Sequence, residues 1–336
     1  MKVLIVAPDA PPYKGGISRI TSILRDGLTH LGHEVSIVSP KFRVGELKFS
    51  TIPFGKYSEF DIIHVHGPTP FLSDLMLLLH SKRRIVYTHH AQISYGSEIV
   101  AGTYRSLHKI LAMKAKALIV HSFDYANLFS AHKNVVVIRP PCAFSNLAGD
   151  FNIYSKSLPF TVLFVGQLRP FKGVNLLIKA ASMVRDVHFI IVGNGYLKPK
   201  LLRLADKLNL ENVMFYSNVS DDELVSFYKK AHVVCLPSVN TTEAWGLVLT
   251  EGALFGCVPL ASNLIGVREN VKLLGGILFR PRSYIDLAKK IRTLSENMNL
   301  WEKLSQKCCK AASKYTKVYS PDYYVRKHIE VFSMII

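Results

Sequence analysis

Short apolar runs rich in β-branched residues alternate along the chain with stretches of helical periodicity. Residues 2–8, KVLIVAP, form the first such run and are typical of a strand that is covered on both faces. After a loop rich in proline and glycine, apolar side chains recur at helical spacing at Ile17, Ile20, Leu24, Leu28 and Leu31. Gly32 then follows as a helix stop, and EVSIVSP (34–40) is the next predicted strand. The pattern predicts a β–α–β unit with a right-handed crossover.

The same alternation continues along the chain and pauses once. Further strands are expected at residues 61–67, 84–90, 117–122 and 135–141. Residues 142–159 are small, polar and rich in turn formers, so they form the expected linker. Beyond it we expect strands within residues 160–168, 188–195, 212–219, 232–238 and 258–262. The helices between and after them are expected near 174–184, 197–208, after Ser220, from about 244 and near 284–298, followed by a basic amphipathic tail. Ser220 and Glu223 are spaced as a capping box.

Strands that alternate with helices in both halves predict an α/β fold of two doubly wound, Rossmann-like domains with parallel sheets. A length of 336 residues also suits two domains better than one. We expect one domain over residues 1–150, a second over 151–315, and a C-terminal helix over 316–336 that returns to the first. Ligands bind beyond the carboxyl ends of parallel strands, so two such domains that face each other would bind them in a cleft.

Composition supports a folded protein with an anionic partner. Hydrophobic residues make up 49% of the chain and charged residues 20%, which excludes a disordered polar chain. The 42 Lys and Arg exceed the 24 Asp and Glu by 18, which favours phosphates, nucleic acid or a lipid surface as a partner. Nucleic acid is the least favoured of these, because no aromatic RNA-binding motif accompanies the charge.

The cysteines and the apolar runs bear on the cellular compartment. The five cysteines are odd in number and form no C-x-x-C, so neither a disulfide framework nor a zinc site is indicated. No apolar run approaches the ~20 residues that a membrane span needs. The apolar core of the first residues is too short for a signal peptide. We therefore expect a cytoplasmic protein, with peripheral contact to the inner face of a membrane left open.

Two carboxylates lie in an otherwise apolar segment, TTEAWGLVLTEGALFGCVPL (241–260). Glu243 follows the strand that ends near Ser238, and a helix that starts near Trp245 or Gly246 would present its free backbone N–H groups as an anion site. Glu251 would lie one helical turn past Leu247, leaning back toward the helix start. Such a tip suits a nucleotide, with pyrophosphate on the amides and the ribose on Glu251. Glu243 would then meet the group attached beyond the phosphates.

The segment EAWGLVLTE resembles the E-x7-E signature of the retaining glycosyltransferases of family 4, which have the two-domain GT-B fold. Other motifs that resemble this family follow in the family's order along nearly the whole chain: PPYKGGISRITSILRDGLTHLGHEVSIVSP, DIIHVHG, VYTHH, FVGQLRPFKGVNLLIKA, FIIVGNG, NVMFYSNVSDDEL and VVCLPS. Any one of them is weak, but so many in order are specific. The resemblance implies an acceptor-side N-terminal domain and a C-terminal domain that binds a nucleotide-sugar donor, without a metal or a further cofactor.

The resemblance assigns the leaving diphosphate to a cationic pair. Lys172, in RPFKG, suits one of the two positions as a point charge on phosphate. The family usually places an arginine directly after the glycine that is Gly166 here. In this chain Gln167 stands at that position, and Arg169 is the expected substitute.

In the first half, Gly15 and Gly16 would let the backbone approach the diphosphate and the sugar. His64, His66, His89 and His90 crowd the predicted strand ends, but their spacing does not define a tetrahedral metal site. The resemblance selects His90 to hydrogen-bond the donor sugar, whereas His89 should point to the opposite face of its strand. The catalytic residues expected on this basis are His90, Lys172 and Glu243. The expected donor-binding residues are Gly15, Gly16, Gly166, Arg169, Lys172, Gly246, Leu247, Val248 and Glu251.

Residues 75–117 are both basic and hydrophobic, so they suit an anionic membrane surface as well as a solvated helix face. The leading hypothesis is a retaining, metal-independent glycosyltransferase that moves a hexose from a UDP- or GDP-sugar to a glycan or lipid-linked acceptor. The alternatives are a nucleotide-sugar epimerase or phosphorylase on the same fold, or a non-catalytic subunit that binds a nucleotide sugar or a partner. A basic nucleic-acid binder ranks below all of these.

Overall fold

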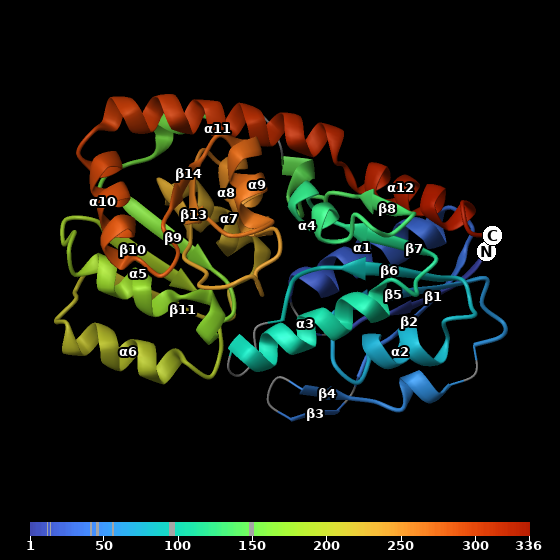
Figure 1. Ribbon diagram of the computed structural model, residues 1–336. Coiled ribbons are helices and arrows are strands. Elements are labelled where there is room, and N and C mark those ends of the chain that lie inside the picture. Colours follow the sequence, from blue (N-terminus) through green and yellow to red (C-terminus); the bar gives the residue numbers. More distant parts are fainter. Residues whose placement is uncertain are drawn as a thin grey trace. The chain divides into compact units, whose positions relative to one another are not determined.

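The computed structural model describes residues 1–336 except Pro12, Lys14, Lys41, Gly45, Glu46, Lys56, 94–97 and 148–150. The last two ranges fall within the predicted membrane region and the predicted linker, so those parts of the two predictions lie outside the described residues. The chain divides into two compact units, one of Met1–Ala143 with Val318–Ile336 and the other of Phe144–Lys317 (Figure 1).

The first unit is built on a six-stranded parallel sheet with the strand order β2-β1-β5-β6-β7-β8. Its strands are β1 (Lys2–Val6), β2 (Glu34–Val38), β5 (Ile62–Gly67), β6 (Ile85–His89), β7 (Ala117–Val120) and β8 (Val135–Val137). Each coincides with a predicted strand. The antiparallel pair β3 (Phe42–Val44) and β4 (Leu47–Phe49) was not predicted.

Helices cover both faces of this first sheet. They are α1 (Gly16–His30), α2 (Ser73–Leu79), α3 (Glu98–Ala112), α4 (Phe123–Leu128), α12 (Pro321–Ser333) and the 3-10 turn η1 (Ile52–Phe54). The C-terminal α12 packs against α1, where Val325 lies so close to Gly27 that a Cβ there would be 2.4 Å from Val325 Cγ2. On the other face α3 packs against α2.

The second unit also has a six-stranded parallel sheet, with the strand order β11-β10-β9-β12-β13-β14. Its strands are β9 (Thr161–Val165), β10 (His188–Val192), β11 (Val213–Tyr216), β12 (Val233–Leu236), β13 (Val258–Ser262) and β14 (Ile277–Phe279). The short edge strand β14 was not predicted. The two parallel sheets confirm the expected fold class of two doubly wound α/β domains.

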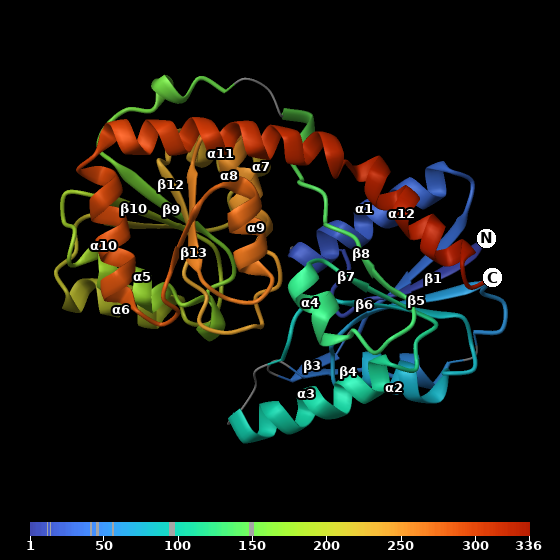
Figure 2. The same ribbon diagram turned by 45° about the horizontal axis from the view of Figure 1, so that its top comes forward.

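In this second unit α5, α6 and α10 cover one face of the sheet, and α7, α8 and α9 cover the other (Figure 2). The helices are α5 (Val174–Ala181), α6 (Lys198–Lys207), α7 (Asp221–Lys230), α8 (Leu247–Leu254), α9 (Val267–Leu274), α10 (Tyr284–Ser295) and α11 (Met298–Val318), with 3-10 turns η2 (Ser145–Leu147), η3 (Ile153–Ser155) and η4 (Pro170–Lys172). The predicted capping box is present: Ser220 and Glu223 bond each other's backbone N–H at the start of α7.

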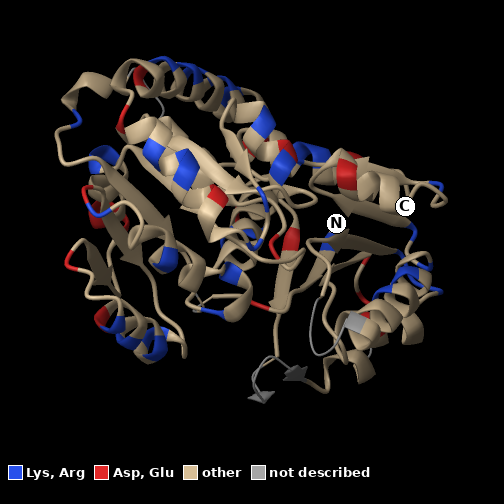
Figure 3. Ribbon diagram, turned by 60° about the vertical axis from the view of Figure 1, so that its left-hand side comes forward, with Lys and Arg blue, Asp and Glu red and all other residues tan. Residues whose placement is uncertain are grey.

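Part of the positive charge of the chain follows α11, where Lys and Arg mark the outer side of the helix (Figure 3). Its exposed lysines recur every three or four residues: Lys303, Lys307, Lys310, Lys314 and Lys317. This is the helix that the basic amphipathic tail predicted.

Candidate functional site

The second sheet changes direction between β9 and β12, its two central strands. From β9 the chain continues outward to β10 and β11, and from β12 it continues the other way to β13 and β14. At such a switch point the loops after the two strands diverge and leave a crevice in which ligands bind. Gly166, Arg169 and Lys172 follow β9, whereas Ser238 and Glu243 follow β12.

Backbone contacts tie these two loops together. Gly173 has a left-handed φ of 65°, and a Cβ at this position would lie 1.9 Å from the carbonyl oxygen of Pro237. Nearby, the N–H of Val239 donates to the carbonyl of Phe171 at 2.8 Å. Only glycine permits both this conformation and this approach, so Gly173 fixes Lys172 against the end of β12.

Lys172 and Glu243 form an ion pair between the two loops. The distance from Lys172 Nζ to Glu243 Oε2 is 2.5 Å, and Ser238 Oγ donates to the same oxygen at 3.1 Å. Gly166 lies beside the pair, since a Cβ there would be 3.7 Å from Lys172 Nζ. Arg169 is half-buried at the N-cap of η4, one turn before Lys172. The structure thus brings Gly166, Lys172 and Glu243 together.

The N-terminus of α8 lies in the loop that carries Glu243. Gly246 is the N-cap, with a left-handed φ of 75°, and α8 begins at Leu247, close to the predicted start. The carbonyls of Trp245 and Gly246 both accept from Asn270 Nδ2 on α9, at 3.0 and 3.2 Å. The first N–H groups of a helix have no partner within it, so this tip can offer amides to an anion.

Glu251 lies one turn into α8 and is buried, with 2% of its surface exposed. Its Oε2 accepts a hydrogen bond from the hydroxyl of Tyr228 on α7, at 2.8 Å. A buried carboxylate needs such partners, because desolvation without them is costly. Glu251 is therefore held by the neighbouring helix, a contact that the sequence did not predict.

In the first unit, His90 is buried between two other histidines. Its Nε2 lies 2.9 Å from His66 Nδ1 and its Nδ1 lies 3.0 Å from His121 Nε2, while His121 Nδ1 lies 2.8 Å from the carbonyl oxygen of Ile138. Burial, and next the neighbouring His121, lower the pKa of His90 well below its ordinary value. The ring is therefore neutral at pH 7.

The Ile138 carbonyl fixes the hydrogen positions along this row. A carbonyl can only accept, so His121 donates from Nδ1 and accepts at Nε2. His90 then donates from Nδ1 and presents Nε2 as an acceptor. Within the described ranges, no group of three or more His, Cys, Asp and Glu is placed to hold a metal ion.

Gly15 and Gly16 lie at the start of α1, in the loop that follows β1. Gly15 is the N-cap of α1 and Gly16 its first residue, and both are exposed. Together with His90 they belong to the first unit, whereas the other expected site residues belong to the second.

Comparison with known proteins assigns the second unit to a family. Residues 150–314 match the family of glycosyl transferases group 1. These residues are similar to a group 1 glycosyltransferase domain. The whole chain is 24% identical to the O-antigen chain mannosyltransferase C of Escherichia coli, over 90% of this chain and 84% of that protein. It is 25% identical to the D-rhamnosyltransferase WbpZ of Pseudomonas aeruginosa, over 86% of this chain and 78% of that protein.

Solved structures with the same fold include two glycosyltransferases of known ligand or product. Sucrose-phosphate synthase from Thermosynechococcus elongatus superposes with a TM-score of 0.78 at 15% identity, covering 99% of both chains. Anabaena HepE in complex with UDP-glucose superposes with a TM-score of 0.74 at 19% identity, covering 98% of this chain and 100% of that one. The chain therefore has the fold of the GT-B glycosyltransferases.

Three residues of this glycosyltransferase support the expected site and were not predicted: Ser238, Tyr228 and Asn270. Ser238 ends a predicted strand, which was a signal that could have pointed to it. Tyr228 and Asn270 lie within helices α7 and α9, and nothing in their local sequence distinguishes them from ordinary helix residues.

Proposed function

We propose that this glycosyltransferase is a retaining, metal-independent enzyme that transfers a hexose from a UDP- or GDP-sugar to a glycan or lipid-linked acceptor. The observation that carries the proposal is the group of residues at the switch point of the second sheet. There, Lys172 and Glu243 are paired at 2.5 Å beside the N-terminus of α8, with the buried Glu251 one turn below. The E-x7-E spacing of the two glutamates resembles that of the retaining family 4 enzymes.

In this proposal the diphosphate of the donor binds Lys172 and the amides of Gly246, Leu247 and Val248. Negative charge develops on the leaving oxygens, and a fixed cation and helix amides stabilise that charge without reorganisation. Gly166 leaves room for the close approach, and Arg169 supplies the second cation. These groups provide the charge stabilisation that a metal ion supplies in other transferases.

Glu243 changes partner in the proposed reaction. Its carboxylate is bound to Lys172 Nζ, the same atom that a diphosphate would contact. A donor phosphate therefore competes for this cation and leaves the carboxylate available to accept hydrogen bonds from the hydroxyls of the sugar. Glu251 accepts from the ribose hydroxyls while Tyr228 holds it in place.

The first unit contributes Gly15, Gly16 and His90. Because the row of histidines makes Nε2 of His90 an acceptor, the group that it binds on the donor sugar is a hydroxyl that donates a hydrogen bond. This bond forms in place of the one to His66. The glycines let the backbone approach the sugar and its phosphates.

Several relatives support a nucleotide-sugar donor and a glycan acceptor. The relatives named above are an O-antigen chain mannosyltransferase and a D-rhamnosyltransferase, and HepE is described in complex with UDP-glucose. The two transferases share the transfer of a sugar, the first of them names a glycan chain, and the HepE complex names an activated sugar.

We place the lipid-linked or membrane-bound acceptor near α3, within the basic region that the sequence indicated. Ile99 and Ile110 are exposed and three turns apart, and Val100 and Leu107 are exposed and two turns apart. An apolar stripe of this kind, on a helix within the basic region, suits the surface of an anionic bilayer on the cytoplasmic face. Among the helices that the structure describes, none is long and apolar enough to cross a bilayer.

The donor site is tested by replacing its two glutamates and titrating UDP and GDP into the full-length protein by calorimetry. Glu251→Ala removes the acceptor of the ribose hydroxyls, so we expect the nucleotide that binds the wild type to bind about 10- to 100-fold more weakly. Glu243→Ala should keep nucleotide affinity within a few-fold and lower the rate at which the donor sugar is released or transferred.

Glu211→Ala is the matched control, because Glu211 is an exposed acid of the same unit. Unchanged UDP and GDP affinity in Glu251→Ala would contradict the proposed ribose contact. Failure of the wild-type protein to bind either nucleotide would contradict the donor site as a whole.

A further inference from the structure

A cavity of about 330 Å³ lies in the first unit at the carboxyl end of β6. Its lining combines histidines, basic side chains and apolar surface: Pro68, His89, Gln92, Ile93, Gly102, Tyr104, Arg105, Ser106, His108, Lys109, Leu128 and Phe129. A volume of this size lies at the lower end of the range for small-ligand pockets. None of the residues assigned to the nucleotide-sugar donor lines it.

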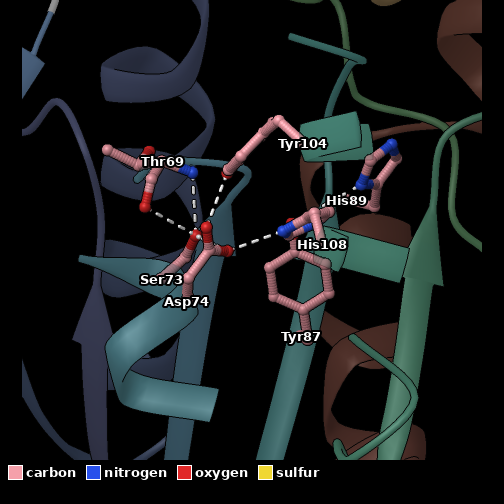
Figure 4. A network of polar contacts seen from close by, with 7 residues as sticks. All are labelled: Thr69, Ser73, Asp74, Tyr87, His89, Tyr104 and His108. Carbon is pink, nitrogen blue, oxygen red and sulfur yellow. Dashed lines mark hydrogen bonds and ion pairs between the residues drawn. The ribbon is translucent and has the colours of Figure 1, made fainter. Parts of the chain in front are cut away.

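A chain of hydrogen bonds lies behind one wall of this cavity (Figure 4). Asp74 Oδ1 is 2.6 Å from His108 Nδ1, and its Oδ2 accepts from the hydroxyl of Tyr104 at 2.7 Å. His108 Nε2 lies 2.8 Å from the hydroxyl of Tyr87, which in turn lies 3.5 Å from His89 Nδ1. The chain connects a carboxylate on α2 to a histidine at the end of β6.

The carboxylate fixes the first donor of the chain. Asp74 accepts from His108 Nδ1, and the other ring nitrogen of His108 is hydrogen-bonded to the Tyr87 hydroxyl. Burial, and next the charge of Asp74, raise the pKa of Tyr87 well above its ordinary value, so this hydroxyl keeps its hydrogen. The Tyr87 oxygen lies within hydrogen-bond reach of His89 Nδ1 as well.

His89 is the end of this chain and lines the cavity. The ring is 3% exposed, and burial lowers its pKa well below the ordinary value, so it is neutral. Nε2 has no hydrogen-bond partner among the described residues, and it lies on the side of the ring away from Tyr87 (Figure 4). Buried polar atoms are normally satisfied, so an unsatisfied ring nitrogen of a residue that lines a cavity points to a ligand that forms a hydrogen bond with it.

The rim of the cavity is positively charged. Arg105 and Lys109 are four residues apart on α3, so they lie on the same side of the helix, and both line the cavity. The one acid of the hydrogen-bonded chain, Asp74, is engaged by His108 and Tyr104 and does not line it. The rim therefore favours an anion, and the wall favours a hydroxyl.

We propose that this cavity binds a phosphorylated sugar, with its phosphate on Arg105 and Lys109 and a sugar hydroxyl hydrogen-bonded to His89 Nε2. Within the proposed function, which this inference deepens, the cavity is the subsite that recognises a phosphate-bearing acceptor. Asp74, His108 and Tyr87 are positioning residues, because their chain of hydrogen bonds ends at His89 Nδ1 and orients the ring. The apolar side chains of Leu128 and Phe129 supply a surface for a sugar face.

Calorimetric titration at low ionic strength tests the site with glucose 6-phosphate and mannose 6-phosphate, compared with the free sugars and inorganic phosphate. We expect at least one sugar phosphate to bind the full-length protein at least tenfold more tightly than phosphate alone. Arg105→Gln and Lys109→Gln should each weaken that ligand and phosphate alike, by about tenfold for a lost charged contact. Lys114→Gln is the control, an exposed lysine just past the end of α3 that does not line the cavity.

Tyr87→Phe tests the hydrogen-bonded chain separately from the charges. It removes one hydroxyl without changing the shape of the ring, so His89 Nδ1 loses its hydrogen-bond partner. We expect the sugar phosphate to bind about fivefold more weakly while affinity for inorganic phosphate stays at the wild-type value, which a general loss of folding would not produce.

Two results would overturn the inference. One is that neither sugar phosphate binds more tightly than inorganic phosphate. The other is that a variant with both Arg105→Gln and Lys109→Gln binds the sugar phosphate with wild-type affinity. UDP and GDP titrations of the same variants keep this question separate from the donor site. Nucleotide binding lies in the second unit, so it should be retained whether or not the cavity binds a sugar phosphate.

Discussion

Asn270, in the middle of α9, holds the start of α8, on which the proposed donor site depends. Its amide nitrogen donates to the carbonyls of Trp245 and Gly246, and its oxygen lies 3.3 Å from Thr250 Oγ1, which donates to it. Asn270→Ala leaves these buried groups unsatisfied at the start of α8. We expect it to lower the free energy of unfolding by about 1–3 kcal/mol and to weaken nucleotide binding, both measured on the purified variant by urea denaturation and calorimetry.

Asn134→Ala provides the comparison, because its side chain also donates to a backbone carbonyl but is exposed. That change should cost well under 1 kcal/mol and leave nucleotide affinity unaltered, since water replaces the lost bond. If Asn270→Ala bound the nucleotide as tightly as the wild type, the start of α8 would not depend on α9.

For single residues, the sequence indicated which side chains form the site, but it did not indicate which of them contact each other. Lys172 and Glu243 were both singled out, but their pairing joins loops 71 residues apart and depends on how two strands lie in the sheet. His90 was singled out as well, whereas the row from His66 to His121 was not. Side-chain contacts of this kind depend on tertiary register, which a local pattern does not encode.

Helix α3 is the element whose surface tests the proposed contact with a membrane. Leu107 and Ile110 are exposed by 54% and 63% on the apolar stripe, so their insertion into a bilayer would bury nonpolar area. Replacing both with serine should weaken binding to vesicles rich in phosphatidylglycerol by about 2–4 kcal/mol in total. Co-sedimentation with these vesicles, and with neutral phosphatidylcholine vesicles, measures the effect.

Ile285→Ser is the control for α3, because Ile285 is 58% exposed at the start of α10 in the other unit. It should bind vesicles as the wild type does. If the α3 variant bound vesicles as tightly as the wild type, the apolar stripe would not be the membrane contact. If the wild type bound anionic and neutral vesicles equally, the basic residues would not contribute to membrane binding.

Most elements could be predicted because their patterns are long or strongly apolar. Buried parallel strands read as continuous runs of Val, Ile and Leu, as in β5 and β7. Elements that escaped prediction have weaker signals. The strands β3 and β4 have three residues each and pair outside the main sheets, β14 is a three-residue edge strand, and α9 has only eight residues. Runs this short bury too few residues to show a period.

At the scale of the whole molecule, buried histidines make the stability of the first unit depend on pH. His328 on α12 is fully buried beside His64, which belongs to β5, so the unit combines the C-terminal helix with a strand near the start of the chain. Burial lowers the pKa of His328 to about 4. His64, His66, His90 and His121 are lowered for the same reason.

The direction of this pH dependence follows from the number of protons that the unfolded and the folded chain bind. Between pH 6.5 and 4 the unfolded chain protonates His328 and the folded chain does not, so stability is complete above pH 6.5 and falls as the pH falls through this window. We expect His328→Leu to narrow the difference in unfolding free energy between pH 7 and pH 5 by about 2 kcal/mol. Urea denaturation followed by circular dichroism at the two pH values measures it. The control is Phe332→Leu, a buried change on the same helix, which should lower the free energy of unfolding equally at pH 7 and pH 5. If His328→Leu left the difference between the two pH values unchanged, the His328 ring would already be protonated in the folded protein at pH 5.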